Sequence, residues 1–300
     1  MPSVLPLDSF RPPAPGRLRR VRGLLGRAAR AGAGALGQDL VKREFYSPVP
    51  HPEELPAEVF ERRSPLRGID FALEPQLSLV RGLAPHIEEL SLPAGFFENI
   101  MYKPVETELL YALLRRRRPG RVIELGSGYS SLVIGAACRR NAEDGDPARY
   151  VAYDPYPQQF VSAGVDGLTE LRSIPASEAP VEDFERLEQG DVLFVDSTHT
   201  VKLGSEVNHI VLNVLPSLSP GVMVHFHDIF LPYEYPREYS DAGLYFAEQY
   251  LVHAFLACNP DYAVRLATYG LARDCPAEIA SIVPSLDPGE PPTALWIERI

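Results

Sequence analysis

One stretch limits the folds open to this chain more than any other: residues 121–131, which read RVIELGSGYSS. An apolar run of strand length comes first, and then Gly126 and Gly128, where the backbone can turn tightly and approach a ligand with no Cβ in the way. A serine of this stretch can cap a helix that continues through residues 132–138. A strand that leads through glycines into a helix is where α/β proteins hold nucleotide-like ligands, although an ordinary βα turn has the same pattern.

Strand-like and helix-like segments alternate along the second two thirds of the chain. Apolar runs of strand length fall at residues 121–125, 150–154, 171–174, 191–196, 222–227, 263–268 and 294–300. Helical spacing of apolar residues marks 105–113, 207–215 and 244–258. This alternation predicts a mostly parallel sheet. The last two runs have no clear helix between them, which predicts a closing antiparallel hairpin.

The first hundred residues have a different character. Residues 1–50 are rich in Pro, Gly, Ala and Arg, and their basic cluster contains Arg17, Arg19, Arg20, Arg22, Arg27 and Arg30. Such a segment could form a basic helix on an anionic surface, or a loose terminus, which is the commoner behaviour of chain ends. Helical spacing follows at residues 77–90. We therefore expect a basic, Pro-rich leader with a helical extension at 1–100 and a Rossmann-like domain at 101–300.

Charge and composition exclude several classes of protein. The net charge of −11 argues against general nucleic-acid binding, and the run Arg115–Arg118 stands before Pro-Gly at a helix end, where cations are favoured. No apolar run has membrane-spanning length, and the first residues lack the pattern of a secretory signal. The three cysteines show neither metal-like spacing nor a disulfide framework. We expect a cytoplasmic protein, and the sequence leaves homo-oligomer formation open.

An acid ends the second strand-like run. In dinucleotide folds an acid at this place binds ribose hydroxyls, so Asp154 is a candidate ribose ligand; the alternative is a solvated Asp ahead of a turn. Ser131 stands where the dinucleotide fingerprint needs Gly or Ala, and no phosphate-loop Gly-Lys-Ser/Thr occurs. A nucleoside without phosphates therefore fits better. Glu124, two residues before Gly126, suits the amino group of an amino-acid tail.

Together these residues resemble a family. Glu124-Leu-Gly-Ser-Gly128, followed by Asp154, Asp196 and His227-Asp228, is similar to the class I S-adenosylmethionine-dependent methyltransferases over roughly residues 100–300. The similarity is closest to bacterial small-molecule O-methyltransferases, which include macrolide sugar methyltransferases. It implies a Rossmann-like, seven-stranded, mostly parallel sheet with the antiparallel C-terminal hairpin. It also implies S-adenosyl-L-methionine as cofactor, its ribose on Asp154 and its methionine end on Glu124, Gly126, Ser127 and Gly128.

Two further strand ends carry polar clusters, Asp196-Ser-Thr-His199 and His225-Phe-His227-Asp228. Parallel strands end at the same edge of a sheet, so Asp196, His227 and Asp228 could converge on Mg²⁺ or another divalent metal. Alternatively these residues only cap strand ends, with His225 facing away from His227. The resemblance implies a metal here and His199 as the catalytic base. However, metal-binding members of the family commonly present two acids where this chain has His227 and Asp228.

The chemistry of the cluster suits methyl transfer to oxygen. A hydroxyl is a poor nucleophile whose proton must leave as the methyl group arrives, and an imidazole such as His199 can take that proton. The aromatic, Pro-rich segment that follows Asp228 could roof the acceptor with Tyr233, Tyr235 and Tyr239, or pack against itself.

The sequence therefore predicts an S-adenosylmethionine-dependent O-methyltransferase that acts on a small-molecule hydroxyl of a sugar or natural product. Two alternatives stay open on the same fold. One is a nicotinamide-dependent oxidoreductase, against which Ser131 and the lack of a clear Tyr-Lys or Arg-His arrangement count. The other is a non-catalytic cofactor-binding accessory protein, because fold alone does not establish chemistry.

Overall fold

The computed structural model describes residues 27–300, apart from residues 39, 42, 45, 48 and 100. The chain divides into two compact units, Met1–His51 and Pro52–Ile300. In the first unit, residues 27–35 form a helix whose side chains are nearly all exposed. The arginines expected to make the leader basic at positions 17, 19, 20 and 22 lie outside the described residues.

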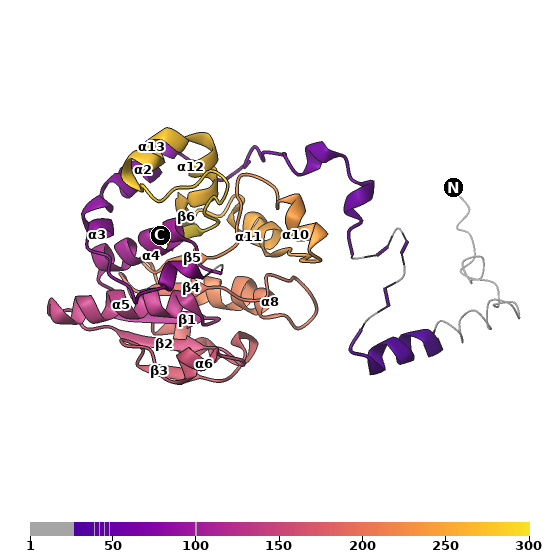
Figure 1. The fold of residues 1–300 in the computed structure, drawn as a ribbon, viewed down its shortest axis with the longest axis horizontal. Coiled ribbons are helices and arrows are strands. Elements are labelled where there is room, and N and C mark those ends of the chain that lie inside the picture. Colours follow the sequence, from indigo (N-terminus) through magenta and orange to yellow (C-terminus); the bar gives the residue numbers. More distant parts are fainter. Residues whose placement is uncertain (1–26, 39, 42, 45, 48, 100) are drawn as a thin grey trace, which may run out of the picture. The chain divides into compact units, whose positions relative to one another are not determined.

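A seven-stranded sheet forms the centre of the second unit (Figure 1). Its strands are β1 (Arg121–Leu125), β2 (Arg149–Tyr153), β3 (Glu170–Arg172), β4 (Val192–Val195), β5 (Met223–Phe226), β6 (Tyr262–Ala267) and β7 (Leu295–Arg299). The strand order is β3-β2-β1-β4-β5-β7-β6. Strands β1 to β5 pair in parallel, and β7 runs antiparallel to both β5 and β6. The predicted fold class, a mostly parallel Rossmann-like sheet with an antiparallel C-terminal pair, is confirmed.

Helices cover both faces of the sheet. On one face a core cluster joins the sheet to α2 (Leu73–Arg81), α4 (Pro104–Arg117), α5 (Tyr129–Glu143), α12 (Thr268–Asp274) and α13 (Pro276–Ile282), with α3 (Ala84–Glu88) against α4. On the other face a second cluster contains α7 (Val181–Glu185), η6 (Ile210–Val214), α9 (Leu215–Ser217) and α11 (Glu248–Leu256). Helix α8 (Glu206–His209) leads directly into the π-helical turn η6. Shorter elements are η2 (Pro52–Glu54), η3 (Ala57–Val59), η4 (Phe96–Glu98), α6 (Gln159–Ser162), η5 (Ala176–Glu178) and α10 (Arg237–Asp241).

Two details of the predicted fold were wrong. Helices α12 and α13 lie between β6 and β7, where the sequence showed no clear helix. Each has seven residues and Pro276 separates them, so neither is long enough to show a clear helical period. The helix expected over residues 77–90 is two helices, because α2 ends at a cap on Gly82 before α3 begins.

The arginine run at the end of α4 supports the fold. Arg115 is buried, and its guanidinium binds Glu89 at 2.7 Å and Asp144 at 2.6 Å. Arg118 takes a left-handed backbone conformation that ends the helix ahead of Pro119. Among the described residues, no helix is both long and apolar enough to cross a membrane.

Candidate functional site

A cleft of about 620 Å³ lies where β1, β4 and β5 end. Ligands of α/β proteins bind outside this edge of the sheet. The lining includes predicted residues from the glycine turn and from both polar clusters: Ser127, Gly128, Asp196, His199, His227, Asp228 and Tyr239. Residues that the sequence did not suggest complete it, among them Met101, Tyr102, Lys103, Glu106, Tyr129, Gln158, Leu244, Phe246 and Thr293.

The glycine turn packs directly against the end of β4. Gly126 has a φ of +83°, and a Cβ there would lie 1.8 Å from the carbonyl oxygen of Asp196. Only glycine fits this position without displacing the backbone. Gly128 is different, since its nearest neighbour would be Gln158 Nε2 at 3.8 Å, so the cleft has room beside it. The first glycine thus holds two strand ends together, and the second keeps the cleft open.

Asp154 follows the end of β2 and is bound to the glycine turn. The amide and the hydroxyl of Ser127 donate to Asp154 Oδ2 at 2.8 and 2.7 Å, and the amide of Tyr156 donates to Oδ1 at 2.7 Å. The Asp154 side chain is half-buried and lies outside the set of residues that line the cleft, whereas Ser127 lies within it. The structure therefore brings Asp154 within one hydrogen bond of the cleft wall.

Glu124 points away from the cleft into the protein. Its carboxylate is fully buried and accepts hydrogen bonds from Ser130 Oγ and Ser131 Oγ, both at 2.7 Å, and from the hydroxyl of Tyr150. Burial raises the pKa of Glu124 to about 7, although the three hydroxyl donors oppose this shift. Ser131 Oγ also accepts from the amide of Gly128 at 3.1 Å. Glu124 therefore lies behind the turn, where it fixes the first residues of α5.

The two polar clusters meet in the cleft. His199 Nε2 lies 3.2 Å from Asp196 Oδ1 and 3.9 Å from Asp228 Oδ2. His227 Nδ1 lies 3.7 Å from Asp196 Oδ1 and 3.5 Å from Asp228 Oδ1. The convergence that the parallel strand ends suggested is present in this geometry.

Two buried carboxylates that the sequence did not suggest hold the histidines from behind. Glu248 Oε2 accepts from His199 Nδ1 at 2.8 Å, and Glu106 Oε2 lies 3.3 Å from His227 Nε2. Glu248 is fully buried and Glu106 is nearly so. A signal was available in the sequence: each acid interrupts the apolar face of a helical segment, Glu106 beside Val105 and Leu109, and Glu248 beside Leu251.

The charges of this cluster do not balance. Burial opposes protonation of His199, but its hydrogen bonds to Asp196 and Glu248 raise its pKa to about 10. Burial also opposes ionisation of Asp196 and Asp228, yet the neighbouring histidines hold the pKa of both acids below the usual value. Four carboxylates face only two imidazoles, and burial raises the pKa of one of these acids, Glu248, so the acids of the cluster outnumber its bases. Buried unpaired charge is costly, so this arrangement favours a bound cation.

Backbone geometry marks the same residues. His199 and Asp228 have φ values of +55° and +52°, in the left-handed region that non-glycine residues rarely adopt. Such strain persists only where the surroundings enforce it, and it gathers at functional sites. The ring of Phe246 lies 4.6 Å from that of His199 and forms part of the cleft wall.

His225 does not face away from His227, as one interpretation of the sequence proposed. The two rings are 6.3 Å apart, and His225 stacks on Phe194 with 4.2 Å between ring centres. Residues two apart on a strand share a face, so the expectation contradicted the period of a strand. His225 is buried among aromatic rings and does not line the cleft.

The three predicted acceptor tyrosines lie in different places. Tyr239 lines the cleft, and its hydroxyl donates to Asp228 Oδ1 at 3.0 Å. The hydroxyl of Tyr233 donates to Asp274 at 2.6 Å, and that of Tyr235 accepts from the amide of Gln249 at 3.0 Å. Neither Tyr233 nor Tyr235 lines the cleft; both belong to an aromatic cluster that also contains Tyr239.

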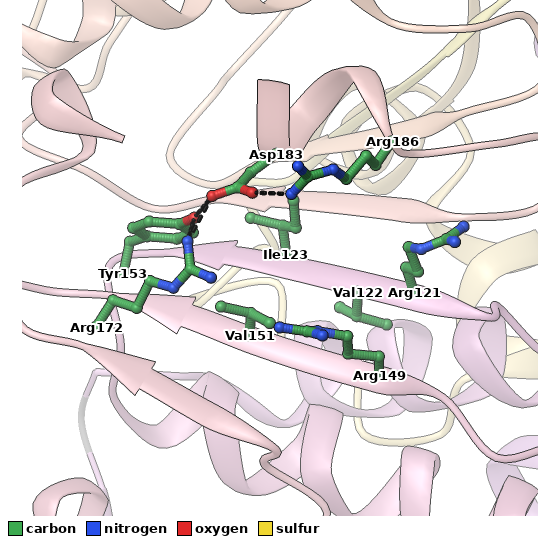
Figure 2. Close-up of a pocket in the computed structure, with 9 residues that line it drawn as sticks. All are labelled: Arg121, Val122, Ile123, Arg149, Val151, Tyr153, Arg172, Asp183 and Arg186. Carbon is green, nitrogen blue, oxygen red and sulfur yellow. Dashed lines mark hydrogen bonds and ion pairs between the residues drawn. The ribbon is translucent and has the colours of Figure 1, made fainter. Parts of the chain in front are cut away.

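A second hollow, of about 370 Å³, lies over β1, β2 and β3 and contains none of the predicted site residues (Figure 2). Four arginines line it, and each is paired with an acid. Arg172 and Arg186 bind Asp183, as Figure 2 shows. Arg149 binds Glu170 at 2.8 Å, and Arg121 lies 3.5 Å from Asp191. Because these ion pairs account for its charges, the cleft at the strand ends is the stronger candidate site.

The donor set in the cleft fits a divalent cation. His227 Nδ1 is buried and makes no hydrogen bond within the described part of the chain. Asp196, His199 and His227 each offer one ligand atom within 4.8 Å of the others. Carboxylate oxygens and imidazole nitrogens are ligands of first-row divalent metals. Three residues are thus in reach of one ion: Asp196, His199 and His227. Asp228 lies beside them, with its carboxylate oxygens 3.9 Å from His199 Nε2 and 3.5 Å from His227 Nδ1.

A family model matches the part of the chain that forms this site. Residues 123–229 match a family model described as a methyltransferase domain, and this range contains both polar clusters and the glycine turn. A protein of Archaeoglobus fulgidus described as uncharacterized is 24% identical over 161 residues, which cover 48% of this chain and 72% of that protein. The apo structure of CalS11, a TDP-rhamnose 3'-O-methyltransferase of calicheamicin biosynthesis, is 13% identical, with a TM-score of 0.38 over 76% of this chain and 95% of that one. A CmcI structure, "cmcI-D160 Mg-SAM", is 14% identical, with a TM-score of 0.37 over 84% and 91%.

Proposed function

We propose that this chain, which carries an S-adenosylmethionine-dependent methyltransferase domain, transfers the methyl group to a hydroxyl of a small molecule such as a sugar or natural product. One observation supports an oxygen acceptor above all. His199 is a buried imidazole between two carboxylates, and it lines the same cleft as the glycine turn. A hydroxyl that receives the methyl group needs a base beside the cofactor to take its proton, whereas a more nucleophilic group does not need one.

In this proposal the cofactor lies along the glycine turn. Ser127 and Gly128 would hold its methionine end, and Gly128 has no Cβ in the way. Its ribose hydroxyls donate to Asp154, which Ser127 holds in place. Gly126 contributes by keeping the turn against β4, and Glu124 by fixing the start of α5 rather than by touching the ligand.

The acceptor hydroxyl lies between the cofactor and His199. Phe246, Leu244 and Tyr239 form part of the cleft wall. Tyr235 packs against Tyr239, and Tyr233 belongs to the same aromatic cluster. The sulfonium supplies the electrophile, so the protein must mainly align the oxygen and take its proton at His199 Nε2. Glu248 accepts from Nδ1 and so leaves Nε2 as the nitrogen that faces the cleft.

His199 must first be free of its proton. With Asp196 and Glu248 both bound to its ring, it keeps that proton at neutral pH, because its pKa is raised to about 10. The base role therefore requires that Asp196 be engaged by another partner. We propose that Asp196, His227 and Asp228 hold a divalent cation, which when bound lowers the pKa of a hydroxyl and positions it.

Calorimetry with S-adenosylmethionine and with its demethylated product tests the cofactor assignment. Both ligands should bind, and Asp154 should contribute to both affinities. The absence of measurable binding by either ligand would contradict the proposal. Binding without turnover on a wide panel of hydroxyl acceptors would indicate a non-catalytic accessory protein instead.

A further inference from the structure

His227 occupies an unusual position in the candidate cation site. It follows β5 directly, and its Nδ1 atom faces Asp196 Oδ1 at 3.7 Å and Asp228 Oδ1 at 3.5 Å. Nδ1 is buried and makes no hydrogen bond with the described residues. A buried polar atom without a hydrogen bond normally has an unseen partner. Here both neighbouring acids are themselves metal-ligand types, so a cation among the three atoms would be that partner.

Glu106 sets which nitrogen of His227 faces this space. Its Oε2 lies 3.3 Å from His227 Nε2, and an ionised carboxylate can only accept, so Nε2 carries the proton. The other oxygen, Oε1, accepts from the amide and the hydroxyl of Thr293 at 2.6 and 2.8 Å. Glu106 is thus fixed at both oxygens, and Nδ1 is the nitrogen that faces the two acids. A cation bound there would replace the Nδ1 proton and take its lone pair. A carboxylate behind a histidine is the usual support of a metal ligand.

The ring of His227 also has a fixed plane. Tyr102 stacks on it with 5.5 Å between ring centres and 27° between planes, and Tyr102 is itself buried. Rotation of the imidazole would break this stacking and the contact with Glu106 together. The nitrogen donor is therefore built into the site.

We propose that this site binds a first-row transition-metal dication in preference to Mg²⁺, with His227 Nδ1 as the selecting ligand and Glu106 as its positioning residue. The proposal rests on the cation in the proposed function. Mg²⁺ prefers an octahedral shell of oxygens and keeps most of its waters, whereas Mn²⁺, Co²⁺ and Zn²⁺ accept imidazole with increasing affinity. An acid at position 227 would give the cation a third carboxylate ligand, as Mg²⁺ prefers. His227 offers a nitrogen ligand instead.

Metal binding to the full-length protein, stripped with chelator, tests this directly. We would titrate Mg²⁺, Mn²⁺ and Co²⁺ by calorimetry and record the visible absorption of the Co²⁺ form, which reports its ligands without any assay of activity. The expected order is Co²⁺ over Mn²⁺ over Mg²⁺, with Co²⁺ binding at least about tenfold tighter than Mg²⁺. His227→Asp should remove that preference and shift the Co²⁺ absorption while still binding Mg²⁺.

Glu106→Gln should weaken Co²⁺ binding roughly 10- to 100-fold, as expected for a residue that supports a ligand. His253→Ala, on α11 and outside the cluster, is the matched control and should change nothing. Circular dichroism and cofactor affinity check that each variant is folded; should Glu106→Gln fail to fold, His227→Asp decides alone. Equal affinity of the parent for Mg²⁺ and Co²⁺, or an unchanged preference in His227→Asp, overturns the inference. If no ion binds while S-adenosylmethionine does, the cation in the proposed function fails as well.

Discussion

Substitution of the two turn glycines should separate stability from ligand binding. Gly126→Ala places a methyl group 1.8 Å from the carbonyl oxygen of Asp196, at a φ of +83°. The left-handed conformation costs an alanine about 1–2 kcal/mol, and overpacking adds about 1–3 kcal/mol. The total of about 2–5 kcal/mol should lower Tm by roughly 5–15 °C in a unit of this size.

Two other glycine variants separate the cost of the backbone conformation from the cost of the steric clash. Gly145 has a φ of +102° with no atom within 4 Å of the added Cβ, so Gly145→Ala should bear only the backbone cost. Gly128→Ala meets its nearest neighbour at 3.8 Å and should stay within about 1 kcal/mol of the parent in stability. Because Gly128 lines the cleft, we expect this variant to lose cofactor affinity instead, by about tenfold or more.

Thermal unfolding and calorimetry with S-adenosylmethionine provide both readouts for all three variants. Gly126→Ala should unfold at a lower temperature than Gly145→Ala, and Gly128→Ala should bind the cofactor more weakly than the parent. The opposite outcome in either comparison would contradict these assignments. Either result would mean that the turn does not lie against β4 and the cleft as described.

Three further predictions follow from single contacts. Asp154→Ala should weaken cofactor binding by roughly 10- to 100-fold in calorimetry with little change in Tm, because charge-assisted hydrogen bonds are worth about 1.5–3 kcal/mol; an unchanged affinity would move the ribose elsewhere. Tyr239→Phe removes the hydroxyl that donates to Asp228 and should lower turnover. Tyr233→Phe should leave turnover unchanged and affect only Tm. Equal effects of the two variants on turnover would contradict the placement of the cleft. In protein stripped of metal by a chelator, protonated His199 stabilises the fold fully below about pH 6.5, and this stability is lost as pH rises through its raised pKa of about 10. Urea unfolding should therefore show a free energy of unfolding that falls over this pH range, and falls less in His199→Asn. Identical slopes in the two proteins would contradict the contacts to Asp196 and Glu248.

Much of the fold could be predicted because its signals are local. The strand, the two glycines and the helix start of residues 121–131 lie next to one another in the chain, and the structure places them as expected. The proximity of Asp196 to His227 and Asp228 could also be predicted, because the ends of neighbouring parallel strands lie at the same edge of a sheet.

The features of the site that could not be predicted depend on contacts between segments that lie far apart in the chain. Glu106 and Glu248 come from helices α4 and α11, and nothing next to them in sequence shows which histidine each one meets. The direction of the Glu124 side chain could not be predicted either, because it depends on a hydrogen bond from the hydroxyl of Tyr150, which lies 26 residues further along the chain. Tyr233 and Tyr235 show the same limit: an aromatic loop can roof a ligand or pack on itself, and only the fold decides.

Methyl transfer by the parent and by His199→Ala, measured side by side with cofactor affinity, tests the central claim most directly. The full-length protein would receive S-adenosylmethionine with a labelled methyl group and a panel of small hydroxyl compounds, and single-turnover rates would be followed by mass spectrometry. We expect the label on an acceptor oxygen, a rate roughly 10²–10⁴-fold lower in His199→Ala, and nearly equal cofactor affinities. A parental rate in His199→Ala, or label on nitrogen or carbon, would contradict the assignment of His199 as the base of an O-methyltransferase.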